Sequence, residues 1–196
     1  MRAFRWLFLT STIALAVAFA SSCRGQQPTA PAAEGGPTPV GTVREVMHGI
    51  VEYNAFKIFN AVAITVTAEG TNKEQPQTDE EWDELLHAAL ALSEAPNLLM
   101  TPGRRISAPA DENTAAGPDE LTPKQIQARI DANRGVWLKH VTELQSVGKE
   151  TMNIVNAKNV DGLFMMGEKI DMVCENCHME FWYPEGGAPP APSEQK

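Results

Sequence analysis

The sequence has few aromatic residues, few cysteines and little positive charge. Its 196 residues include 2 tyrosines, 7 phenylalanines and 3 cysteines. A sheet rich in aromatic residues is therefore disfavoured, and three cysteines are too few for a disulfide scaffold. The formal net charge of −9 excludes a nucleic-acid binder of the usual kind, which needs clustered lysine and arginine against the phosphates. The 8 methionines instead favour an adaptable helical core.

The first 22 residues predict an export signal. Two arginines precede an uncharged stretch at positions 6–20, which is too short to favour a membrane-spanning helix, and small residues follow it. Residues 18–20 form an A-x-A cleavage site, as in a soluble periplasmic protein. Residues 20–23 instead resemble a bacterial lipobox, in which Cys23 would become the lipidated N-terminus. We expect the lipidated form and keep the soluble form as the alternative.

Composition divides the chain into four parts. We expect a signal peptide of the lipoprotein type at 1–22, a flexible tether rich in proline, alanine and glycine at 23–41, a folded domain at 42–183 and a disordered tail at 184–196. The exported chain would lie in the bacterial periplasm and contact the membrane through its lipid anchor only. Its acidity favours a partner protein with a basic docking patch and disfavours nucleic acid.

Four segments of the expected domain carry apolar residues at helical spacing. They span about 43–67, 79–101, 123–155 and 160–183. Pro96 should kink or nearly end the second helix. The β-branched residues near position 65 weaken the end of the first, where a strand stays open. With loops between the segments and no hairpin signal, the sequence predicts an all-α fold, an antiparallel four-helix bundle.

One motif carries recognisable chemistry. Residues 174–178 read C-x-x-C-H, the attachment signature of c-type haem. On a helix, thiols three residues apart lie on one face and can each add to a haem vinyl group, while the next imidazole reaches the iron. The motif thus predicts one covalent haem c, attached at Cys174 and Cys177, with His178 as the proximal iron ligand.

Three other interpretations of the cysteine pair stay open. A thioredoxin-type redox pair would need a βαβ pattern, which the sequence does not show. A zinc site would need further ligands, and the chain has no second C-x-x-C and no H-x-x-x-H. The two cysteines could also be buried or disulfide-bonded residues without a cofactor.

The position of the motif, near the end of the last predicted helix, resembles the class II c-type cytochromes, which comprise cytochrome c′ and its low-spin relatives. Residues 43–62, VREVMHGIVEYNAFKIFNAV, are similar to the first helix of that family. Residues 92–104, LSEAPNLLMTPGR, are similar to the end of its second helix. The resemblance covers about 42–183 and implies a four-helix bundle that carries its haem at the C-terminal end.

The same resemblance directs attention to the distal side of the iron. In low-spin members a methionine of the first helix binds the iron, whereas in cytochromes c′ proper the iron is five-coordinate. Met47 lies on the apolar face of the first predicted helix and is the expected distal ligand, since a thioether raises the reduction potential. An open distal site, a purely packing role for Met47, or His48 as ligand are the alternatives.

Other polar and sulfur-bearing residues receive lesser roles. Arg44 shares the side of Met47 and could pair with a haem propionate; Arg104 and Arg105 are weaker candidates. His87 and His140 are expected to be partly exposed on their helices. The remaining methionines of the domain are expected to pack in the core or near the surface: Met100, Met152, Met165, Met166, Met172 and Met179.

Two departures from the family pattern stand out. Phe181 matches an aromatic residue three positions after the proximal histidine, but Trp182 stands where a basic residue commonly follows. The loop at 103–121 and the proline-rich tail are also longer than a compact bundle needs. They either shape a partner site or are tolerated insertions.

The sequence therefore predicts a monohaem electron carrier that works by outer-sphere exchange with redox partner proteins. With both axial positions of the iron filled, no substrate site remains, so we expect no enzymatic activity. A five-coordinate module that binds NO or CO is the first alternative, and a non-haem thiol or zinc module is the second. Pairing into a homodimer, as in many cytochromes c′, stays open.

Overall fold

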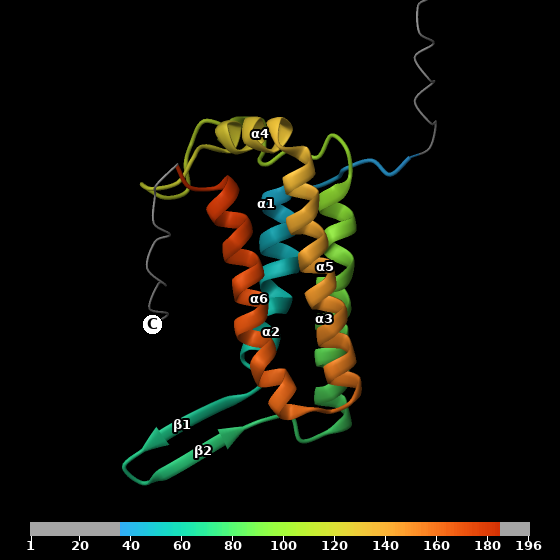
Figure 1. Cartoon of the computed structure of the whole chain (residues 1–196), viewed down its shortest axis with the longest axis vertical. Coiled ribbons are helices and arrows are strands. Elements are labelled where there is room, and N and C mark those ends of the chain that lie inside the picture. The colour runs from blue at the N-terminus through green and yellow to red at the C-terminus, as the bar shows by residue number, and fades with distance from the viewer. Residues whose placement is uncertain (1–35, 185–196) are drawn as a thin grey trace, which may run out of the picture. The chain divides into compact units, whose positions relative to one another are not determined.

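The computed structural model describes residues 36–184. The predicted signal peptide, the lipidated Cys23, most of the tether and the tail after Pro184 lie outside these residues. The described part is mostly helical and also contains a small two-stranded sheet (Figure 1). None of its helices combines the length and the apolar character needed to cross a membrane.

The first helical segment changes its winding along its length. It consists of α1 (Val43–Val46), a π-helical turn η1 (Met47–Glu52) and α2 (Tyr53–Phe59). At its start the Thr42 hydroxyl accepts the Glu45 N–H, and the Glu45 carboxylate accepts the Thr42 N–H at 2.7 Å, which forms a capping box. The prediction of one regular helix reaching position 67 is wrong, both because of the π turn and because the helix ends at Phe59.

A hairpin follows instead of further helix. Strands β1 (Ala63–Thr67) and β2 (Gly70–Glu74) pair antiparallel, with Thr67 opposite Gly70 across a two-residue loop. The β-branched residues of β1 favour extended backbone, and Gly70 has a φ of 140°, which glycine adopts readily. The expectation of an all-α chain without a hairpin is therefore wrong for these residues.

Helix α3 (Asp79–Met100) starts at a second capping box, formed by Thr78 and Glu81. It continues through Pro96 to Met100, so of the two expected effects of this proline, a kink or a near end of the helix, the near end is wrong. A proline removes one backbone hydrogen bond from a helix, and the Pro96 ring is fully buried in the core.

The third predicted helix is divided in two. Helix α4 (Pro123–Ala132) begins with the expected Thr122 cap and first-turn proline, and α5 (Arg134–Asn156) follows directly. At Asn133 the backbone leaves helical geometry (φ −125°, ψ 42°), while its N–H bonds to the carbonyls of the last turn of α4. Figure 1 shows α4 lying across the end of the long helices rather than in line with α5. A single helix over 123–155 is therefore wrong.

Helix α6 (Val160–Phe181) starts at the predicted Asn159 cap and completes the core. Helix α3 packs against α2 and α5, and α6 also packs against α2 and α5, so that these four helices form a closed ring of contacts (Figure 1). The short 3-10 turn η2 (Pro109–Asp111) lies in the connection between α3 and α4. The largest fully buried side chains come from α2, α3 and α6: Ile58, Leu92, Leu163, Met166, Ile170 and Phe181.

Helix α5 lies very close to α3 at Gly148, and a substitution there tests this contact. A Cβ atom at Gly148 would lie 2.7 Å from the Ser93 backbone nitrogen and 2.9 Å from the Leu92 carbonyl carbon. Because helix backbone would have to shift, Gly148→Ala should lower the free energy of unfolding by about 1–3 kcal/mol in urea denaturation. The control is Gly167→Ala on α6, where the new Cβ would meet Phe59 at an ordinary 3.6 Å. It should be neutral or stabilise by up to about 1 kcal/mol, and equal effects of the two variants would contradict the close approach.

Candidate functional site

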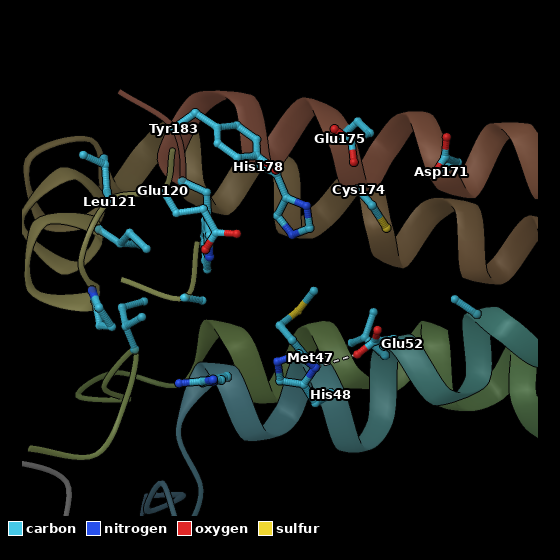
Figure 2. Close-up of a pocket in the computed structure, with 18 of the residues that line it drawn as sticks. Met47, His48, Glu52, Glu120, Leu121, Asp171, Cys174, Glu175, His178 and Tyr183 are labelled. Atoms are coloured by element: carbon cyan, nitrogen blue, oxygen red, sulfur yellow. Dashed lines mark hydrogen bonds and ion pairs between the residues drawn. The ribbon is translucent and has the colours of Figure 1, made fainter. Parts of the chain in front are cut away.

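A cavity of about 450 Å³ lies between the end of α6 and the first helical segment. Figure 2 shows the Met47 thioether and the His178 ring pointing toward one another from opposite walls, with Cys174 one turn before His178. The volume falls within the range of about 300–1,000 Å³ usual for small-molecule and cofactor sites. Much of the lining is apolar: Val51, Ala55, Phe56, Phe59, Ile106, Leu121 and Ile126.

A smaller pocket of about 30 Å³, the inner chamber, shares Met47, Cys174, His178 and Trp182 with this cavity as lining residues. Cys177 lines this chamber, whereas Cys174, His178 and Met47 line both spaces. The structure thus brings the two predicted attachment thiols, the predicted proximal histidine and the predicted distal methionine to two pockets that share lining residues. Arg44, the candidate propionate partner, lies on the wall of the larger cavity.

The π turn governs how Met47 is presented. The turn starts at Met47 and places one extra residue between the buried side chains of Val46 and Val51, which are five positions apart. Such turns occur frequently at functional sites. His48 lies at the rim instead, with its Nδ1 2.6 Å from Glu52 Oε2 and its side chain 64% exposed. In this geometry Met47, rather than His48, faces His178.

Burial keeps the His178 imidazole neutral near pH 7. Desolvation lowers the pKa of His178 below its usual value, while the charges of Glu175, Glu120 and Glu52 oppose this shift. A histidine must be deprotonated to bind a metal ion. The environment of His178 therefore suits a ligand role.

The two thiols have the opposite character from a redox-active pair. Burial raises the pKa of Cys174 to about 11 and that of Cys177 to about 12, and neighbouring negative charges add to both shifts. Thiol–disulfide exchange uses cysteines with a lowered pKa. Both thiols are free, and residues 36–184 contain no group of three or more His, Cys, Asp or Glu side chains arranged to hold a metal ion. The raised pKa values weigh against a thiol-exchange pair.

Trp182 supports the His178 ring. Its ring centroid lies 5.4 Å from that of His178, and it stacks on Trp137 of α5 at 6.5 Å with an interplanar angle of 22°. Phe181, fully buried, packs edge-on against Trp137 at 5.7 Å. Trp182 thus packs against the imidazole.

The long loop between α3 and α4 forms part of the cavity wall. The Leu121 N–H donates to the Trp182 carbonyl at 2.8 Å, which fixes the loop to the end of α6. Through Thr114, Ala116 and Glu120 the loop reaches the cavity, and Figure 2 shows the Glu120 carboxylate on the His178 side of it. The loop is therefore part of the site rather than a peripheral insertion.

Sequence reasoning missed two residues of the inner chamber. Trp137 Nε1 and His140 Nδ1 are buried there without a hydrogen-bond partner among the described residues. Glu143 Oε2 lies 3.3 Å from His140 Nδ1, but not in hydrogen-bond geometry. The His140 side chain is 12% exposed, whereas His87 is exposed as expected. The available signal was the three-residue spacing of Trp137 and His140, which places both on one face of a helix.

The charge around the larger cavity is mainly negative. Four carboxylates line it, and Arg44 is the cation among its lining residues. The carboxylates come from the first helical segment, the loop and α6: Glu52, Glu120, Asp171 and Glu175. Arg104 and Arg105, the weaker propionate candidates, line a different groove.

Comparison with known proteins identifies no relative of this chain. No protein-family model, no curated protein and no solved structure matches it. The function therefore has to be argued from the cavity, its thiols and its facing side chains.

Alkylation tests the burial of the thiols in the chain without haem. At pH 8 iodoacetamide should modify Cys174 and Cys177 at least about a hundredfold more slowly in the folded chain than in guanidinium, since the raised pKa leaves about a hundredfold less thiolate. Mass spectrometry resolves the rate at each cysteine. The variant Ser146→Cys, at an exposed position of α5, should react equally fast in both conditions. Rates at Cys174 and Cys177 that do not change on unfolding would contradict the buried site.

Proposed function

We propose that this protein is a monohaem c-type cytochrome of the class II, low-spin type that transfers electrons to and from redox partners. The observation that carries the proposal is the facing of the Met47 thioether and the His178 imidazole across one cavity, beside the C-x-x-C-H thiols. The same side chains, identified by spacing and resemblance, come from segments more than 120 positions apart in the chain.

The residues of the cavity fit one covalent haem c. Cys174 and Cys177 would attach it, and His178 and Met47 would hold the iron from either side. The apolar lining suits a porphyrin ring, and Arg44 on the wall suits a propionate. When bound, haem iron supplies one-electron transfer between its ferrous and ferric states.

The chain's own residues explain why this would be a carrier and not an enzyme. His178 and Met47 would both bind the iron, which would leave no ligand position for a substrate. Trp182 packs against the His178 ring, and the loop up to Leu121 forms one wall of the cavity. Carboxylates around the cavity favour a redox partner with a basic docking patch.

The arrangement of helices supports the antiparallel four-helix bundle that the resemblance implies. The closed ring of contacts among α2, α3, α5 and α6 is the packing expected of such a bundle. In this interpretation α4 and the hairpin are additions at its two ends.

Cellular location and assembly follow the sequence prediction. We propose a bacterial periplasmic lipoprotein anchored through Cys23, with the soluble periplasmic form as the alternative. Pairing of two copies is compatible with this function.

Absorption spectra of protein exported together with a haem-attachment system test the proposal. The wild type should carry covalent haem with a low-spin spectrum and the weak methionine-sulfur charge-transfer band. Met47→Ala should abolish this band and lower the reduction potential, because the thioether ligand that raises it is lost. The matched control Met172→Ala, at a side chain 54% exposed on α6, should leave both unchanged.

The other outcomes of this experiment are equally informative. A wild type without covalent haem, or one whose haem attachment survives Cys174→Ala combined with Cys177→Ala, would contradict the proposal. A high-spin wild type that responds to carbon monoxide would favour the gas-binding alternative.

A further inference from the structure

The loop that closes the cavity has a second, very different face. An open groove of about 640 Å³ lies between residues 101–112, α4 and the start of α5. Ile106 and Pro123 line both the groove and the cavity, so the two spaces lie on either side of one wall. Nothing in the proposed electron carrier uses this groove.

The groove is the cationic part of an acidic chain. Four cations line it, against the two carboxylates of Glu112 and Asp131. The cations are Arg104, Arg105, Lys124 and Arg134. The cavity behind the wall shows the reverse balance, with four carboxylates and one arginine. Charge of opposite sign is therefore separated across one loop.

Two of the four cations have a structural task. Arg104 Nε donates to the Leu98 carbonyl at 2.7 Å, and Arg134 donates to the Met100 carbonyl at 2.9 Å. They bind the last turn of α3, which has no basic residue of its own. Because a guanidinium has five N–H donors, each side chain keeps further donors for another acceptor.

The other two cations are on the surface. Arg105 is exposed and pairs with Glu112 at 3.0 Å. Lys124 is exposed and forms no ion pair with a carboxylate in the part of the chain that the structure describes. No fold contact requires the Lys124 charge, so it is available to an external anion.

The groove also borders the point where the chain enters the domain. The Arg104 guanidinium donates to the Gly41 carbonyl at the end of the predicted tether. If the predicted tether at 23–41 behaves as a flexible chain, its root-mean-square reach would be about 20–25 Å. If Cys23 carries the proposed lipid, the groove stays within this distance of the membrane surface.

We infer that this groove docks on an anionic phospholipid surface, with Arg105 and Lys124 contacting lipid phosphates. The inference rests on the proposed lipid anchor and adds a second membrane contact to it. Each cation near such a surface strengthens binding about fivefold, and the tether supplies a high effective concentration. Repulsion of the acidic faces from the same surface selects one orientation of the domain.

Hydrogen–deuterium exchange on vesicles tests this docking. The exported protein is reconstituted into vesicles of phosphatidylcholine, either alone or with phosphatidylglycerol as a quarter of the lipid. Phosphatidylglycerol should slow exchange in 101–112 and in α4, and high salt should reverse the effect. Arg105→Gln combined with Lys124→Gln should lower the equilibrium constant for docking about 25-fold, with a corresponding loss of the slowed exchange.

The matched control combines Lys139→Gln with Lys149→Gln on α5. Lys139 is in a surface ion pair, as Arg105 is, and Lys149 is exposed, as Lys124 is. The two double variants change the net charge by the same amount. This control should retain the slowed exchange. Equal exchange on both vesicle types, or loss of protection in the control, would overturn the inference.

Further measurements distinguish lipid phosphate from a small soluble anion, and distinguish docking from the proposed anchor and haem. Soluble glycerol phosphate should not protect the groove on phosphatidylcholine vesicles; protection there would identify a small-anion site and overturn membrane docking. Sedimentation with phosphatidylcholine reports the anchor by itself. If the protein has no anchor, it should not sediment with vesicles of phosphatidylcholine only. Sedimentation only with the vesicles that contain phosphatidylglycerol would then support docking, and no sedimentation with either kind of vesicle would overturn it. Haem content, read from the spectrum, is independent of all these measurements.

Discussion

The structure is organised around a face of α6 that its neighbouring helices do not fill. Cys174, Cys177 and His178 lie half-buried there, opposite a thioether from the first helical segment. Such a space in a helical core is stable only if surrounding residues hold its walls apart. The π turn at Met47, the loop fixed to the Trp182 carbonyl and the stack of Trp182 on Trp137 provide that support.

Much of the secondary structure follows from local patterns in the sequence. Threonine and asparagine caps, followed by apolar residues at helical spacing, predict where α3, α4 and α6 begin. The errors occur where short stretches carry two compatible patterns. The β-branched residues of β1 are compatible with a helix end or with a strand. Apolar residues keep helical spacing on both sides of Asn133, so the pattern does not indicate the change of direction that tertiary packing imposes there.

The candidate site divides in the same way. The C-x-x-C-H motif and Met47 are recognisable because helical spacing and family resemblance specify them. Glu120 and His140 reach the site only through the path of a loop and the packing of α5 on α6. No spacing rule relates them to His178, so a single sequence cannot identify them. Trp182 was noticed as a departure from the family, but its contact with the imidazole required the fold.

The π turn has a consequence for how such a site could diversify. One inserted residue rotates the side chains before it by about 100° relative to those after it. Loss of one residue between Met47 and Val51 would restore regular winding while Val51, Ala55 and Ile58 kept their places in the core. A length change in one turn, with no substitution at Met47, could then redirect the thioether. The choice between a filled and an open distal position would thus be encoded in helix length as much as in residue identity.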